Sequence, residues 1–145
     1  MAISIAQAIN HLLDVSHFGV SGAVAPRIIY YAHMMFMGRT EGDLLVHERF
    51  YALATGPSTP TIQSLLSGYG HSPIKHRIKE PLPKLGAETK AIEQTWLAIK
   101  DLSPEMIQKE VMREKTAWKR FYRTDRLAPL SDRAIFEEFI ELHDA

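Results

Sequence analysis

The chain has 145 residues, with 17 basic and 17 acidic side chains, seven histidines and no cysteine. This length fits one domain, predicted over residues 1–145, whose core needs no disulfide or metal to fold. The lack of cysteine excludes disulfides, thiol nucleophiles, iron–sulfur clusters and cysteine-bound zinc. A net charge of zero argues against a general nucleic-acid coat, because such proteins carry a surplus of lysine and arginine.

The composition is that of an ordinary globular protein, with 46% hydrophobic and 23% charged residues. No apolar run approaches the roughly 20 residues that span a bilayer. Residues 1–13 lack a basic segment and include Gln7, Asn10 and His11, so no secretory signal is expected. We therefore expect a cytoplasmic protein that does not associate with membranes.

Hydrophobic periodicity predicts the first two helices over residues 4–16 and about 23–37. Ser4 is the expected cap of the first helix, and Ser21 is the expected cap of the second. The second helix is apolar around most of its circumference, which is typical of a central, buried helix. Its pattern places Pro26 in the first turn and Gly38 at the C-terminal end.

The middle of the chain is less regular. Residues 44–46 fit either a short strand or an extended connection. The break at residues 56–60 leads into a third helix, capped by Thr59 and ending near residue 67. Gly70 is expected to adopt a positive φ after it. Residues 74–86 contain two prolines, Pro81 and Pro83, and are expected to form a long surface connection, which makes them a candidate functional loop.

Three further helices are predicted over residues 87–101, from Pro104 to about 113, and from Asp132 onward. Ser103 and Ser131 precede the last two as capping residues. No helix is assigned between them, because the pattern around Trp118 is weak. The predicted fold class is all-α or mostly α. It is a compact single-domain bundle of about six helices around a central buried helix. The sequence is also compatible with a short β element in this fold.

Motifs for catalysis are missing from the sequence. The seven histidines include no HExxH pair, and no serine lies in a GxSxG elbow. The glycines around Tyr69 lack the lysine and the spacing of a phosphate-binding loop. Any two of the 17 acidic residues could converge, but nothing singles out a pair. We therefore predict no catalytic residue, no cofactor and no metal ligand.

Charge is unevenly distributed along the second half of the chain. Residues 109–126 contain seven basic and three acidic side chains, a net charge of plus four. Residues 132–144 contain five acidic side chains and one arginine, a net charge of minus four. The basic segment can bind an anionic partner, such as nucleic acid or an acidic protein face. We favour the other interpretation, a helix or turn whose aromatic side chains pack inward while its charges are solvated. The opposite net charges are also compatible with pairing of the two segments within the molecule.

Tyr30 and Tyr31 occupy neighbouring positions on the most apolar helix, about 100° apart around its axis. One ring can enter the core while the other directs its hydroxyl group toward the loop at residues 56–57. A structural role in the core is favoured over a ligand site for this pair.

Three segments carry a more specific pattern. Residues 27–32 read RIIYYA, residues 52–60 read ALATGPSTP, and residues 69–74 read YGHSPI. In this order they resemble the Panacea (pan-antitoxin) domain, which shows a basic residue, two aliphatics and Tyr-Tyr-Ala, then Ala-Trp-x-x-Gly-Pro-Val-x-Pro, then Tyr-Gly-x-x-Pro-Ile. The resemblance covers nearly the whole chain and is firmest over residues 21–74. Five positions differ from the family's usual residues: Leu53, Ser58, the pair Met112 and Arg113, and Ala117.

The resemblance implies a non-catalytic protein that binds and neutralises a partner toxin in a stoichiometric complex, as antitoxins of this family do. The same domain is also found in phage-associated proteins. Homodimerisation is compatible with this role. The expected contact regions are residues 56–60, 71–86 and 115–126, because exposed loops, aromatics and arginines commonly form interfaces. The expected partner-binding residues are Gly56, Pro57, Pro60, Tyr69, Arg77, Trp118, Arg120 and Arg123. Residues expected to be structural are Arg27, Tyr30, Tyr31, Ala32 and Pro73.

Two other function classes remain open from the sequence. One is a nucleic-acid-binding regulator of its own operon, with residues 115–126 on the phosphates. The other is a small hydrolase without a recognisable motif.

Overall fold

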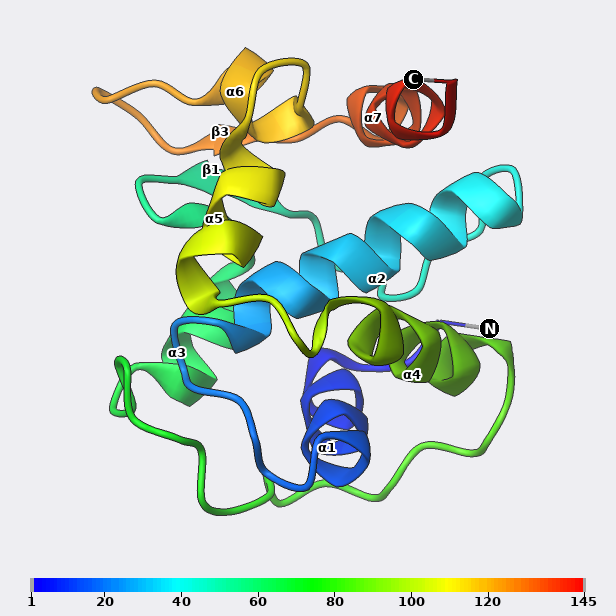
Figure 1. Cartoon of the computed structure of the whole chain (residues 1–145), viewed down its shortest axis with the longest axis vertical. Coiled ribbons are helices and arrows are strands. Elements are labelled where there is room, and N and C mark those ends of the chain that lie inside the picture. The colour runs from blue at the N-terminus through cyan, green and yellow to red at the C-terminus, as the bar shows by residue number, and fades with distance from the viewer. Residues whose placement is uncertain (1, 145) are drawn as a thin grey trace.

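The computed structural model describes residues 2–144 (Figure 1). The prediction of a mostly α protein with a short β element is confirmed. Within these residues no helix has both the length and the apolar character needed to cross a bilayer. The elements are α1 (Ile5–Val15), α2 (Ala25–Arg39), β1 (Tyr51–Leu53), β2 (Gly56–Ser58), α3 (Pro60–Leu66), α4 (Ala87–Ile99), α5 (Pro104–Met112), α6 (Ala117–Phe121), β3 (Ala128–Pro129) and α7 (Asp132–Asp144).

Local capping explains where several helices begin. The Ser4 hydroxyl group accepts a hydrogen bond from the Gln7 backbone N–H at 3.0 Å, and the Gln7 side chain accepts one from the Ser4 N–H at 3.1 Å. Thr59 and Ser103 accept hydrogen bonds in the same way at the starts of α3 and α5. Because these bonds satisfy N–H groups that the helix leaves free, they select the starting residue. The predicted starts of these three helices are confirmed.

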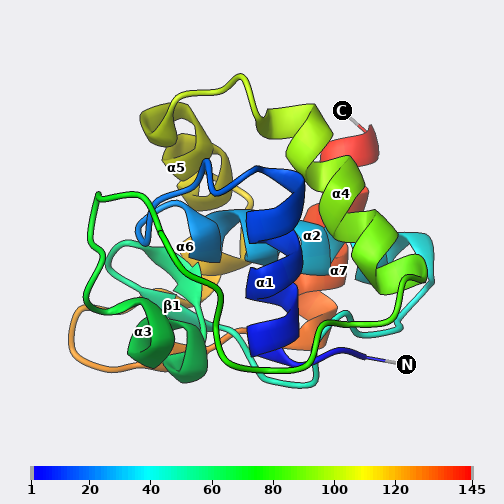
Figure 2. The same ribbon diagram turned by 90° about the horizontal axis from the view of Figure 1, so that it is seen from below.

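Helix α2 runs through the middle of the molecule. All its residues are buried except Tyr31, which is half-buried, and Arg39. Helices α1 and α4 cover one side of α2, and α7 lies on the other (Figures 1 and 2). The prediction of a central, buried second helix is confirmed, since an element apolar on nearly every face must be surrounded by others.

Two expectations about the ends of α2 are wrong. Helix α2 begins at Ala25, after the N-cap residue Val24, and Ser21 lies outside it, although the Ser21 hydroxyl group accepts a hydrogen bond from the Val24 N–H at 3.2 Å. Gly38 lies inside the helix, which continues to Arg39. A Cβ atom at Gly38 would lie 2.1 Å from Cγ of Phe139 on α7. The glycine therefore serves close packing between helices and does not terminate α2.

Two features were not predicted. Residues 56–58, expected as a loop, form β2, the edge of an antiparallel sheet ordered β2-β1-β3. Pro57 is tolerated there because an edge strand need not donate on its outer side. Helix α6 was missed because five residues are too few to show a helical period. Residues 44–46, left open as strand or connection, form an extended connection with a single bridge between Val46 and Ile3.

Candidate functional site

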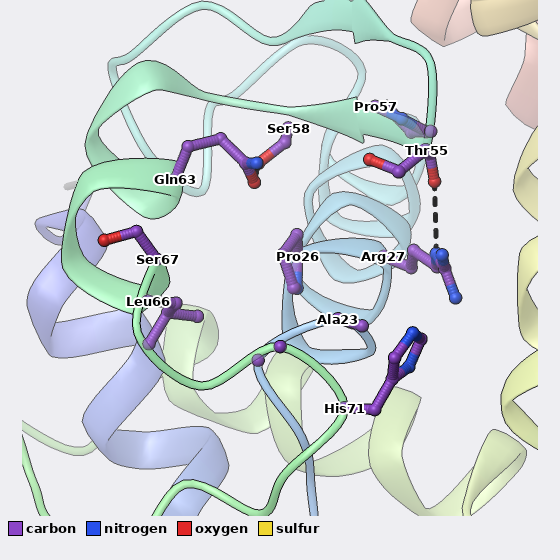
Figure 3. A pocket seen from close by; sticks show the side chains of 13 residues that line it. Ala23, Pro26, Arg27, Thr55, Pro57, Ser58, Gln63, Leu66, Ser67 and His71 are labelled. Atoms are coloured by element: carbon purple, nitrogen blue, oxygen red, sulfur yellow. Dashed lines mark hydrogen bonds between the residues drawn. The ribbon is translucent and has the colours of Figure 1, made fainter.

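A pocket of about 280 Å³ lies between the start of α2, the turn joining β1 to β2, and α3 with the loop that follows it (Figure 3). Each of the three segments that resemble the Panacea domain contributes to its lining. Arg27 comes from the first segment, residues 55–58 from the second, and Gly70 and His71 from the third. Residues far apart in the sequence thus meet at one concave site.

The backbone conformation at two glycines shapes this pocket. Gly56 follows the turn between β1 and β2 with a φ of 124°, and Gly70 follows α3 with a φ of 54°. The prediction of a positive φ at Gly70 is confirmed. Glycine adopts these angles without the steric cost that a Cβ atom imposes. The first turn presents the Thr55 carbonyl oxygen to the Arg27 Nε–H at 3.3 Å, and the second leads into His71.

Arg27 is the one charged side chain that lines this pocket, and it is only 7% exposed. Burial lowers the pKa of its guanidinium group, and the negative charge of Glu105 acts in the opposite direction. An arginine nevertheless stays protonated at neutral pH. The sequence indicated Arg27 as a structural residue, but its burial without an ion pair to any of residues 2–144 was not foreseen.

The other side of the pocket carries neutral polar groups. Ser58 is buried, and its hydroxyl group donates a hydrogen bond to Oε1 of Gln63 at 2.8 Å. In Figure 3 Ser58 and Gln63 lie on one side of the Pro26 ring, and Arg27 and His71 lie on the other. The pocket therefore has polar groups on both sides of this apolar ring. These side chains can recognise a small polar ligand.

A second feature is the loop of residues 75–86, which is tied to α1. The Asn10 amide group donates to the Ile78 carbonyl oxygen at 2.9 Å and accepts from the Ile78 N–H at 2.7 Å. Gln7 donates to the Pro81 carbonyl oxygen at 3.3 Å, and Asp14 pairs with Arg77. Gln7, Asn10 and Asp14 follow one another at helical spacing on one face of α1. That polar spacing was the available sequence signal for this contact.

The expected partner-binding residues lie in different environments. Gly56 and Pro57 are buried in β2, Tyr69 is half-buried, and Pro60 is exposed at the start of α3. The guanidinium group of Arg77 is exposed and lies 5.7 Å from the centre of the Phe18 ring. Of the residues expected to be structural, Tyr30 and Ala32 are buried and Tyr31 is half-buried. Pro73 is exposed and forms a backbone bridge with Ser21.

Trp118 is buried and supports the sheet from α6. Its indole N–H donates to the Leu53 carbonyl oxygen at 2.6 Å, and its ring stacks on Tyr122 with centroids 4.7 Å apart. Both the N–H group and the ring face of the indole therefore contact other parts of the protein. Through these contacts Trp118 joins α6 to β1.

The basic segment pairs with the acidic final helix, an arrangement that the opposite net charges of the two segments indicated. Lys115 contacts Glu141 at 3.2 Å, and Arg120 contacts Glu137 at 2.6 Å. The hydrogen bond from Arg120 is also the main cause of the lowered pKa of Glu137. Arg123 instead donates to the backbone carbonyl oxygens of Arg120 and Tyr122. A phosphate bound to this segment would compete with these acceptors.

A buried carboxylate links α2, α6 and α7. Glu138 is 2% exposed, and its Oε1 accepts hydrogen bonds from the Tyr30 hydroxyl group at 2.7 Å and from the Ala117 N–H at 2.9 Å. Burial raises the pKa of Glu138, and the hydrogen bonds from Ala117 and Tyr30 lower it in part. The Tyr30 hydroxyl group is therefore bound within the core, which agrees with the expectation that one tyrosine of this pair enters the core.

The substitution Tyr30→Phe is expected to lower the free energy of unfolding by about 1.5 kcal/mol at pH 7, since it removes a buried hydrogen bond to a carboxylate. The loss should shrink as the pH falls, because the bond favours ionised Glu138 and matters less once that group is protonated. Urea unfolding at several pH values measures both effects. Tyr31→Phe is the control, since no hydrogen bond joins its hydroxyl group to residues 2–144. An equal loss in both variants would contradict the assignment.

No group of three or more histidine, aspartate or glutamate side chains within residues 2–144 is arranged to hold a metal ion. Comparison of the chain with protein-family models, with curated proteins and with solved structures finds no match. The likeness to the Panacea domain therefore rests on the amino-acid sequence alone.

Proposed function

We propose that this protein is a non-catalytic antitoxin that neutralises a partner toxin by forming a stoichiometric complex with it. Two observations support the proposal. The first is the resemblance of residues 27–32, 52–60 and 69–74 to the Panacea domain. The second, which carries the most weight, is the loop of residues 75–86, which makes up most of the expected contact region at residues 71–86.

This loop presents apolar side chains to solvent from an anchored backbone. Leu82 is 56% exposed and Leu85 is 86% exposed, while Asn10 holds the loop at Ile78 through two hydrogen bonds. Binding a partner costs less entropy when the contacting segment is already held in place. Exposed leucines on a tethered loop therefore favour contact with an apolar surface of another protein.

The charge of the loop indicates what surrounds that apolar surface. Residues 75–86 contain four lysine and arginine side chains and one glutamate. Arg77 is paired with Asp14, which leaves the lysines to face solvent. Complementary charge speeds association and selects the partner. The toxin is therefore expected to present an apolar cleft with carboxylates at its rim.

A growth assay tests whether this protein neutralises a toxin. The product of the adjacent gene is expected to arrest growth when expressed alone, and coexpression of this chain should restore growth. Size-exclusion chromatography of the two purified proteins should then show a complex of fixed stoichiometry. Growth arrest that persists in the presence of the chain would contradict the proposal.

The variant Leu82→Ser/Leu85→Ser is expected to bind the toxin about 30-fold more weakly, because two partly exposed leucines lose the free energy of their burial at the interface. Calorimetric titration measures the affinity. The control is Leu97→Ser/Leu127→Ser, which removes two leucines outside the loop that are each more than half exposed. Equal affinity of both variants for the toxin would show that the loop is not the contact surface.

A further inference from the structure

Arg27 is a buried cation that forms no ion pair with the described residues, although the negative charge of Glu105 acts on it. It is more than nine-tenths buried, and its Nε–H donates to the Thr55 carbonyl oxygen at 3.3 Å. Its two terminal nitrogens, Nη1 and Nη2, make no hydrogen bond and no ion pair with any residue that the structure describes. Charged side chains are seldom buried to this extent unless they are paired. The two terminal nitrogens of Arg27 are therefore available to bind a ligand.

Two cavities meet at this side chain. Arg27 and His71 line both the pocket of about 280 Å³ and a neighbouring one of about 530 Å³. In Figure 3 the imidazole ring of His71 points toward the guanidinium group of Arg27, and the hydrogen bond to Thr55 lies on the other side of that group. A ligand can therefore approach the free end of the arginine from solvent.

The surrounding charges favour an anion in the smaller pocket. None of the residues lining this smaller pocket is an aspartate or a glutamate. Glu105, whose charge acts on Arg27 without forming an ion pair, lines the larger cavity instead. The first N–H groups of α2 do not supply the site, because Ala25 and Arg27 donate to the backbone oxygens of Ser21 and Val24. The guanidinium group is thus the main source of attraction for a negative charge.

The geometry of the donors narrows the class of ligand. With Nε occupied by Thr55, the two terminal nitrogens form a planar fork, which matches the two oxygens of a carboxylate or a phosphate group. At about 280 Å³ the pocket is slightly smaller than most ligand sites, which measure about 300–1,000 Å³, so it suits a small ligand. We propose that this pocket binds a small oxyanion, a carboxylate or a phosphate group, through the two terminal nitrogens of Arg27.

This site is separate from the proposed contact loop, so its test does not depend on a toxin. Sodium phosphate and sodium acetate are titrated separately into the purified protein, with sodium chloride at matched ionic strength as the reference. Heteronuclear NMR follows the Nε–H signal of Arg27 and the backbone signals of residues 55–57 and 71. At least one of the two oxyanions is expected to shift these signals saturably, with a Kd on the order of 1 mM. The anion that binds more tightly identifies the preferred chemistry.

The variant Arg27→Met keeps much of the side-chain volume and removes the donors. Saturable binding should weaken at least about 10-fold, and the Tm in anion-free buffer should stay the same or rise, because an unpaired buried cation has been removed. Arg126→Met, which removes an exposed arginine, is the control for net charge and should bind like the unchanged protein.

The mapping on the unchanged protein keeps the test decisive even if Arg27→Met fails to fold. Signals that shift no more in phosphate or acetate than in chloride, or that shift saturably only in residues 115–126, would overturn the proposal. Binding by a folded Arg27→Met variant as tight as that of the unchanged protein would also overturn it.

Discussion

Replacing Gly38 with alanine is expected to lower the free energy of unfolding by about 3 kcal/mol, because the added methyl group overpacks a helix interface. In an exposed helix interior the same change stabilises by about 1 kcal/mol, since alanine has the higher helix propensity. Here the new Cβ atom would lie 2.1 Å from Cγ of Phe139 and 2.3 Å from each Cδ atom. These atoms are near the root of the ring, so α2 and α7 must separate to relieve the contact.

Urea unfolding of a double-mutant cycle tests this cause. In the Phe139→Ala background the ring is gone, and Gly38→Ala should then cost far less than it does alone. Gly68→Ala is the matched control, since no atom lies within 4 Å of a Cβ placed there. If Gly38→Ala is neutral or stabilising in the unchanged background, the packing of α7 against this glycine is not as described.

Lowering the pH from 6.5 to 4 is expected to cost roughly 3 kcal/mol of folding stability through His33 alone. His33 is 1% exposed, its Nδ1 has no hydrogen-bond partner among residues 2–144, and its ring lies 4.9 Å from that of Phe50. This burial lowers the pKa of His33 from 6.5 to about 4. In that pH range the unfolded chain binds a proton that the folded protein excludes, so acidification favours unfolding.

The difference between two stability profiles isolates this effect. His33→Leu removes the titrating group, so its free energy of unfolding should fall less steeply than that of the unchanged protein between pH 6.5 and pH 4. Burial also lowers the pKa of His11 and raises that of Glu138, but both groups are present in both proteins and cancel in the difference. His76→Gln removes an exposed histidine and is the control. Parallel profiles for His33→Leu and the unchanged protein would contradict the prediction.

Elements governed by nearby residues could be predicted from the sequence. Ser4, Thr59 and Ser103 each accept a hydrogen bond from an N–H three residues ahead, so the information that starts these helices lies within one turn. The apolar circumference of α2 likewise indicated a central position. The pairing of residues 115–120 with α7 followed from the opposite net charges of the two segments.

Elements that depend on distant partners could not be predicted. Strand β1 forms because β2 and β3 lie beside it, although β3 is more than 70 residues away along the chain. Gly38 has the pattern of a helix end, and only Phe139 on α7 reveals its packing role. A short strand or a single glycine carries too little local information to identify a neighbour from another part of the chain.

The same division applies to the candidate site. The sequence by itself determined the helix starts, the positive φ at Gly70 and the three segments that carry the family resemblance, because each depends on residues close together in the chain. Tertiary structure alone decided that these segments meet around Arg27, and that this arginine is buried with its terminal nitrogens unpaired. Burial and charge pairing depend on what the rest of the chain places around a side chain, and that environment is set only when α2, the sheet and α3 pack together.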